Sequence, residues 1–276
     1  MATNAATKYA EKVAERFTGK SKTEGHFNND YDWSGVKTIQ VYSVDAPTLN
    51  DYQRTGSNRY GTPNELGDTL QELSVTQDKS FTYTIDKGND EDTKKIKSRA
   101  GKRLQRTIDE VIVPAVDKYR FTKWAEGAGH AETGAAPTLD TIVGLIFDAG
   151  AHLDNQLVPA EGRVLYIKAS SYKVLAQCDE FLQLEKPGTQ AIVKGEVGEI
   201  DGMKVIKVPD SWMPDDVYFM VIHKSAVLSP FKLQEYKTHE NPPGINGWLI
   251  EGRIYYDAFV LEAKKDAVYT YGAVEE

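Results

Sequence analysis

The sequence lacks most features that mark an enzyme, a metalloprotein or a secreted protein. Its 276 residues contain one cysteine, Cys178, which excludes a disulfide framework and a four-cysteine zinc site. Its five histidines are scattered without the spacing of metal ligands. Neither a phosphate-binding glycine loop nor a Gly-x-Ser-x-Gly motif occurs. The sequence therefore predicts no catalytic residue, no cofactor and no metal, and we expect no enzyme.

Long hydrophobic runs and an excess of positive charge are absent as well. No stretch approaches the roughly 20 apolar residues of a membrane helix, and the first 15 residues are too polar for a secretory signal. A net charge of -8 argues against a general nucleic-acid-binding protein, although it leaves room for a local basic face. We expect a soluble protein, made in the cytoplasm, with no membrane partner.

The most distinctive pattern that is present is a long helix. Apolar residues recur every three or four positions, as on one face of a helix: Ile96, Ala100, Leu104, Ile108, Ile112, Ala115 and Tyr119. Asn89 can cap its start and Gly127 can end it. The pattern predicts a helix over about residues 92–126, roughly 50 Å long at 1.5 Å per residue. Pro114 lies inside it and predicts a kink.

The first half of this helix is strongly basic, with no acid between its positive residues: Lys94, Lys95, Lys97, Arg99, Lys102, Arg103 and Arg106. Like charges at helical spacing repel each other, so the run indicates a partner of negative charge. Three hypotheses stay open. The run contacts acids of a neighbouring subunit, or packaged DNA with help from a basic N-terminal stripe, or it is a solvated face.

Ahead of the helix the pattern is that of strands. Residues 37–44, 70–76 and 81–85 are expected to be strands, and a polar stretch rich in turn residues separates the first two. A connection that long is unusual in a compact domain. We therefore predict an extended hairpin arm that packs on another molecule. Its candidate contact residues are charged: Arg54, Arg59, Glu65, Asp68 and Glu72.

Beyond the helix, helices and strands are mixed. Residues 127–137 are expected to be a small-residue linker, followed by a helix that Thr138 caps. Next come a buried strand at 164–167, a helix at 172–184 and a hairpin turning at Asp201-Gly202. Cys178 lies in the expected helix at 172–184 and is expected to be a structural thiol. Strands fill the rest: residues 217–222, 231–236, 248–261 and 268–271. The predicted class is α+β.

In this order the sequence resembles the major capsid proteins of tailed bacteriophages, a coat-protein fold shared with herpesvirus shells and encapsulins. The matching segments are residues 76–86 (TQDKSFTYTID), 113–121 (VPAVDKYRF), 161–167 (EGRVLYI), 195–205 (GEVGEIDGMKV), 241–247 (NPPGING) and 252–258 (GRIYYDA). The resemblance covers about residues 29–271, and the order of the segments carries it.

The resemblance implies a domain division. Residues 1–35 are an N-terminal arm, and residues 36–86 are the extended β-hairpin called the E-loop. Residues 87–135 and 226–276 form the P-domain, with the spine helix at about 92–126. Residues 136–225 form the α/β A-domain. In some relatives a long N-terminal scaffold segment comes first; strand-like sequence by Val36 leaves no room for one here.

The implied function is structural: a major capsid protein that self-assembles, through hexamers and pentamers, into the icosahedral virion shell around packaged double-stranded DNA. The implied partners are other copies of the chain, a separate scaffolding protein, a portal, and the DNA through non-specific contacts. An encapsulin-like compartment that encloses a cargo enzyme is the alternative, because fold alone does not separate the two. A soluble enzyme with an α/β insertion is the third hypothesis.

Overall fold

The computed structural model describes residues 21–33, 37–44, 47–63, 65, 67–87, 104–178 and 196–274. It divides the chain into two compact units. The smaller unit is Trp33–Ser74, and the larger unit contains the rest of the described chain. Both sheets and helices occur, so the predicted α+β class is confirmed.

The smaller unit is built on a two-stranded antiparallel ladder. Strand β1 (Thr38–Val44) pairs with β2 (Asp68–Ser74), so that Thr38 lies opposite Ser74 and Val44 opposite Asp68. The hydroxyls of Thr38 and Ser74 lie 2.6 Å apart and close one end. The described residues between the strands form no further ladder. The predicted hairpin is confirmed, with β2 starting two residues earlier than expected.

A six-stranded mixed sheet forms the centre of the larger unit, in the order β4-β13-β8-β5-β7-β6. Its strands are β4 (His130–Gly134), β5 (Arg163–Lys168), β6 (Glu196–Ile200), β7 (Met203–Val208), β8 (Val217–His223) and β13 (Val268–Ala273). All six residues of β5 are buried. Because a strand covered on both faces carries no polar alternation, its middle, residues 164–167, reads as one apolar run between Arg163 and Lys168.

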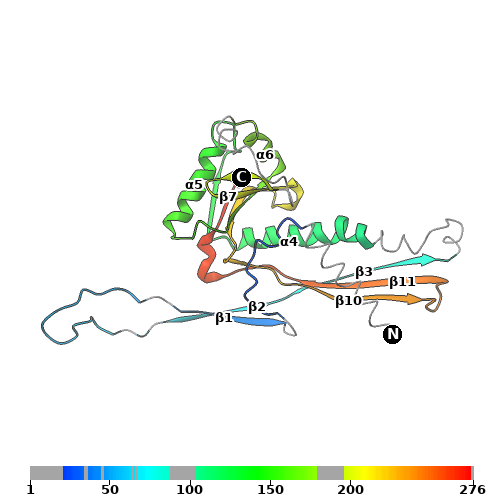
Figure 1. The fold of residues 1–276 in the computed structure, drawn as a ribbon, viewed down its shortest axis with the longest axis horizontal. Helices are drawn as coiled ribbons and strands as arrows, with labels where there is room; N and C mark the ends of the chain where they lie inside the picture. Colours follow the sequence, from blue (N-terminus) through cyan, green and yellow to red (C-terminus); the bar gives the residue numbers. More distant parts are fainter. Residues whose placement is uncertain are drawn as a thin grey trace. The chain divides into compact units, whose positions relative to one another are not determined.

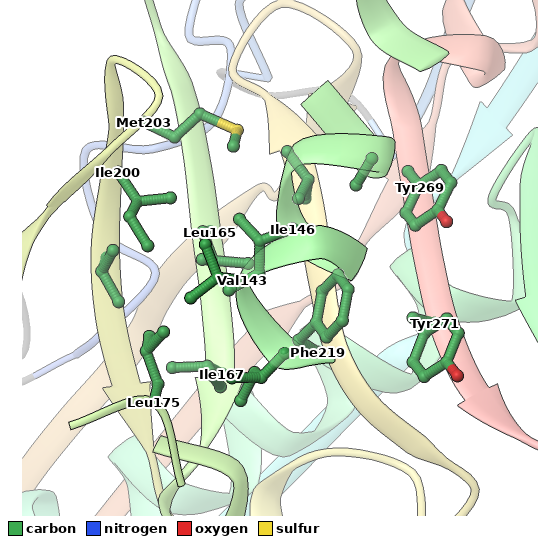
Figure 2. Close-up of a cluster of buried hydrophobic side chains, with 14 of the residues drawn as sticks. Val143, Ile146, Leu165, Ile167, Leu175, Ile200, Met203, Phe219, Tyr269 and Tyr271 are labelled. Carbon is green, nitrogen blue, oxygen red and sulfur yellow. The ribbon is translucent and has the colours of Figure 1, made fainter. Parts of the chain in front are cut away.

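Helices α5 (Ile142–Asn155) and α6 (Ala169–Leu175) lie against this sheet (Figure 1). Val143 and Ile146 of α5 pack with Leu165 and Ile167 of β5 and with Phe219 of β8 (Figure 2). Cys178 is buried in the same cluster, which fits the expected structural thiol. A second cluster on the sheet joins Phe121 and Trp124 of the long helix to Tyr166, Met220 and Ile222.

Three antiparallel strands form a separate sheet in the order β10-β11-β3. They are β3 (Gln77–Asp86), β10 (Phe231–Glu240) and β11 (Gly247–Tyr256). Ile85, Ile250 and Ile254 of this sheet cluster with Leu104, Ile108 and Ile112 of the long helix. The expected strand at 248–261 is in fact two strands: β12 (Phe259–Val260) is separate and pairs with β9 (Val227–Leu228). Figure 1 shows the three strands running beside α4.

The long helix is continuous from Leu104 to Glu126 within the described residues. Its end at Gly127 is confirmed. A kink was expected at Pro114; the structure has a π-helical turn, Ile108–Ile112, directly before α4 (Val113–Glu126), with Pro114 in the first turn of α4. A π turn holds one extra residue, so it rotates the buried face of the helical turns after it. The stripe therefore continues through Val113 and Val116, whereas Ala115, expected on it, is exposed.

Three other expectations are corrected by the structure. The segment 127–137 was expected to be a linker, but it contains β4, which pairs in parallel with β13. Helix α5 has Thr141 at its N-cap position, without a capping hydrogen bond from the side chain, and begins three residues later than a Thr138 cap implies. Helix α6 begins three residues before the expected start at Tyr172 and ends at Leu175, so Cys178 lies beyond its end and not within a helix reaching residue 184.

Candidate assembly surfaces

The smaller unit presents large apolar side chains to solvent. Six of the eleven most exposed large apolar side chains in the described structure belong to it: Tyr42, Val44, Leu49, Tyr52, Tyr60 and Leu70. Leu49 is fully exposed and Tyr60 is 83% exposed. Burying one such side chain contributes about 1.5–3 kcal/mol. An apolar surface of this kind on a slender hairpin is typical of an interface.

The connection between β1 and β2 has local order of its own. Tyr52 and Tyr60 meet edge to face with ring centroids 5.0 Å apart, and the Gln53 amide donates to the Arg59 carbonyl at 3.0 Å. Gly56 takes a positive φ of 89°, and Arg59 Nε donates to its carbonyl at 3.2 Å. Arg54 and Arg59 are both exposed, so this turn presents two positive charges.

The three predicted acidic contact residues also lie on the smaller unit. Glu65 is in the connection, and Asp68 and Glu72 are on β2. All three are exposed. The structure thus places all five predicted arm residues on the surface of one unit.

Of the seven basic residues on the long helix, the structure describes Arg106. Lys94, Lys95, Lys97, Arg99, Lys102 and Arg103 lie outside the described residues. The Arg106 guanidinium donates to both carboxylate oxygens of Glu110 from Nε, at 2.7 and 2.8 Å. This contact raises the pKa of Arg106. Since both side chains are exposed, the pair contributes little to stability.

The described part of the chain contains neither a cluster of metal-ligating side chains nor a membrane-spanning helix. No group of three or more histidine, cysteine, aspartate or glutamate side chains there could hold a metal ion. No described helix is long and apolar enough to cross a membrane.

No known family model matches the sequence, and no curated protein resembles it at the level of sequence. Solved structures do resemble it. A structure from Mycobacterium phage Che8 has a TM-score of 0.62 and 21% identity, covering 90% of this chain and 89% of that one. The capsid structure of the cyanophage P-SCSP1u has a TM-score of 0.65 and 15% identity, and the match covers 88% of this chain and 85% of that one. The structure of a virus-like particle from Pyrococcus furiosus has a TM-score of 0.59 and 10% identity, and the match covers 97% of this chain and 99% of that one.

The chain has the fold of shell-forming proteins. More particularly, its fold is that of phage capsid proteins, and the match extends over nearly the whole chain. The fold implied by the sequence resemblance is therefore confirmed. The sequence did not single out the exposed apolar residues of the arm. The expected alternation in this strand rested on Ile39 and Val41, whereas Tyr42 and Val44 lie on its opposite, exposed face, where no pattern marked them.

Proposed function

We propose that this chain is a major capsid protein, which self-assembles into the icosahedral shell around packaged phage DNA. The fold, matched to phage capsid structures, supports this role. The observation that carries the proposal is the concentration of exposed apolar side chains on one hairpin unit. Such a hairpin gains stability by covering those side chains against another copy of the chain. The role is structural, with no catalysis by the chain itself.

The domain division proposed for the chain follows the same fold. The smaller unit, Trp33–Ser74, supplies most of the proposed E-loop at residues 36–86. Strands β5, β6, β7 and β8 of the six-stranded sheet, with α5 and α6, fall in the A-domain at 136–225, and β4 and β13 of the same sheet fall in the P-domain ranges. The long helix and strands β10 and β11 of the three-stranded sheet fall in the P-domain at 87–135 and 226–276, and β3 falls at the end of the E-loop range. Residues 1–35 are the N-terminal arm.

We assign the charged residues to contacts between copies. Glu65, Asp68 and Glu72 on the arm of one subunit offer acids to the basic half of the spine helix on the next. Arg54 and Arg59 give the arm tip a positive charge that suits an acidic surface. Packaged double-stranded DNA is the second candidate for the basic half, bound through its phosphates without sequence preference. A separate scaffolding protein and a portal complete the proposed set of partners.

An encapsulin-like compartment around a cargo enzyme is the alternative function. The similarity to a virus-like particle shows that the fold is not limited to structures named as phage capsids. Phage capsid structures nevertheless recur among the similar structures, and they favour the capsid role. Particles that hold DNA, rather than a cargo protein, would separate the two functions.

Deletion of residues 50–67 tests the proposal. Because Val44 pairs with Asp68, joining Leu49 to Asp68 leaves a five-residue connection, a common length for a hairpin. We expect a folded subunit that no longer forms shells, seen by negative-stain electron microscopy and by circular dichroism. As a control, the substitution Thr82→Val at an exposed position of β3 should leave shells intact. Normal shells from the deletion variant, or an unfolded variant, would contradict the proposal.

A further inference from the structure

A chain of buried and partly buried hydrogen bonds joins two segments that are far apart in the sequence. One is residues 21–24, on the N-terminal side of the smaller unit, and the other is Thr76, on its C-terminal side. We call these segments the two roots of the arm. Both belong to the larger unit, and both are held by residues at or beside helix α4.

Asp117 of α4 holds the N-terminal root. Its carboxylate is fully buried and accepts hydrogen bonds from the Ser21 hydroxyl at 2.7 Å, the Thr23 hydroxyl at 2.7 Å and the Lys22 amide at 2.8 Å. A buried carboxylate costs free energy unless it is hydrogen-bonded. The three hydrogen bonds from residues 21–23 therefore offset the cost of burying the Asp117 carboxylate.

Arg120, one turn further along α4, continues the chain. Its Nη1 donates to the Thr23 hydroxyl at 2.7 Å and lies 3.3 Å from a carboxylate oxygen of Glu24. The guanidinium also lies over the ring of Phe27, 4.8 Å from its centroid. On the other side, Arg120 Nε donates to the Ser229 hydroxyl at 2.5 Å. This one fully buried side chain thus contacts both the N-terminal root and a residue beyond it.

Asp257 holds the C-terminal root. Its Oδ2 accepts from the Thr76 amide at 2.7 Å and from the Thr76 hydroxyl at 2.8 Å. Its Oδ1 accepts from the hydroxyl of Tyr119, on α4, at 2.9 Å. The Ser229 hydroxyl donates to the Asp257 backbone carbonyl at 3.0 Å. Ser229 is therefore the joint between the two halves, with Arg120 on one side and Asp257 on the other.

We propose that this chain of hydrogen bonds, named here the root clamp, couples the two roots of the arm, so that loosening either root loosens the other. The chemical reason is that the roots share buried partners, and hydrogen bonds in a buried network strengthen one another. Docking of the arm on a neighbour would then change how tightly the roots are held against α4. This last consequence rests on the proposed docking of the arm on a neighbouring subunit, whereas the coupling itself does not.

Hydrogen exchange in the Thr76→Val variant tests the coupling. The substitution removes one hydroxyl donor at the C-terminal root, and the readout is the exchange rate of the Lys22, Thr23 and Glu24 amides at the other root. We expect those amides to exchange about threefold faster or more, with Thr76→Ser restoring the normal rate. Thr82→Val, on an exposed position of the same strand β3, is the matched control and should change nothing at residues 22–24. An effect confined to residues 75–77 would overturn the proposal.

A double-mutant cycle identifies the joint. Thr23→Val and Thr76→Val are combined, and unfolding of the dissociated subunit by urea is measured for each variant. The clamp predicts a non-additivity of about threefold or more in the unfolding equilibrium constant, which disappears when Ser229→Ala is present. Additive effects with Ser229 intact would overturn the coupling. Both experiments work on dissociated subunits, so their failure would leave the capsid proposal standing, and failed shell assembly would leave the clamp standing.

Discussion

The imidazole rings of His130 and His152 are stacked, with their centroids 4.0 Å apart and their planes 24° apart. His130 lies on β4 at the edge of the six-stranded sheet, and His152 lies near the end of α5. The ring of Tyr269 on β13 stacks on His130 at 5.1 Å, and its hydroxyl donates to Glu132. The stack therefore ties the C-terminal part of α5 to the edge of the sheet.

This stack predicts that acid destabilises the subunit. Burial lowers the pKa of His152, and the charge of His130 lowers it further, against the opposing effects of Asp266 and Glu132. The folded protein thus binds this proton less readily than the unfolded chain does. The contribution to stability is present above the ordinary histidine pKa of about 6.5 and is lost as the pH falls from there through the lowered pKa of the folded state.

His152→Gln should therefore make the free energy of unfolding less dependent on pH between about pH 7.5 and 5.5, a window that spans the ordinary histidine pKa. Urea melts of the dissociated subunit at both pH values measure this. Some dependence will persist, because burial also lowers the pKa of His223. A variant with the same pH dependence as the natural protein would show that His152 is not a source of it.

The buried stripe of the long helix predicts a large loss of stability for Ile108→Ala. Ile108 is 1% exposed and packs between the helix and the three-stranded sheet. Truncation of such a side chain costs about 2–5 kcal/mol. Val111→Ala, in the same π turn but on a side chain 59% exposed, is the matched control and should cost well under about 1 kcal/mol. Equal losses in urea melts would contradict the assignment of the buried face.

The arm predicts a shell without covalent links between subunits. Some relatives join an E-loop lysine to an asparagine of a neighbour, but this sequence has no lysine between Lys37 and Lys79. Arg54 and Arg59 stand at the tip instead, and a guanidinium that stays protonated is no amine nucleophile. Boiled shells should run as a single band of about 30.8 kDa on a denaturing gel. A ladder of heat-stable oligomers would contradict this and direct attention to Lys79.

The basic half of the helix predicts a sensitivity to charge reversal. If it meets the arm of a neighbour, Arg99→Glu with Arg103→Glu should block assembly, and added salt should weaken assembly of the natural protein because exposed ion pairs are screened. If it meets DNA, empty shells should still form and only DNA retention should fall. Electron microscopy with nuclease-protection assays separates these outcomes. If the variant shows normal assembly and normal DNA retention, the basic half of the helix has neither partner and is a solvated face.

The elements that sequence alone predicted are those that local chemistry determines. The hairpin at Asp201-Gly202 is an example, because both residues take the positive φ that such a turn needs. The helix end at Gly127 is another. Strand β4 was missed because its five residues gain order only from β13, which lies well over a hundred residues further along the chain. No local pattern carries that information.

The candidate functional residues also fall into a group that the sequence predicted and a group that it did not. The charged arm residues could be named from their place in a polar connection, and the structure puts them on the surface. The root clamp could not be named. Asp117 and Arg120 read as ordinary charged positions of a helix surface, and their burial depends on a polar segment, residues 21–24, that reads as a turn. The expected partner of each basic residue lies in another molecule, which no single sequence displays.

The π turn in the long helix also bears on how this sequence can vary in length. From Leu104 to Val116 the helix packs on the three-stranded sheet, and further along Phe121 and Trp124 pack on the six-stranded sheet. Adding or removing one residue between Ile108 and Val116 would rotate the rest of the helix by about 100°. Trp124 would then leave its sheet while Ile108 kept its own. This segment should accept changes of residue type far more readily than an insertion or deletion.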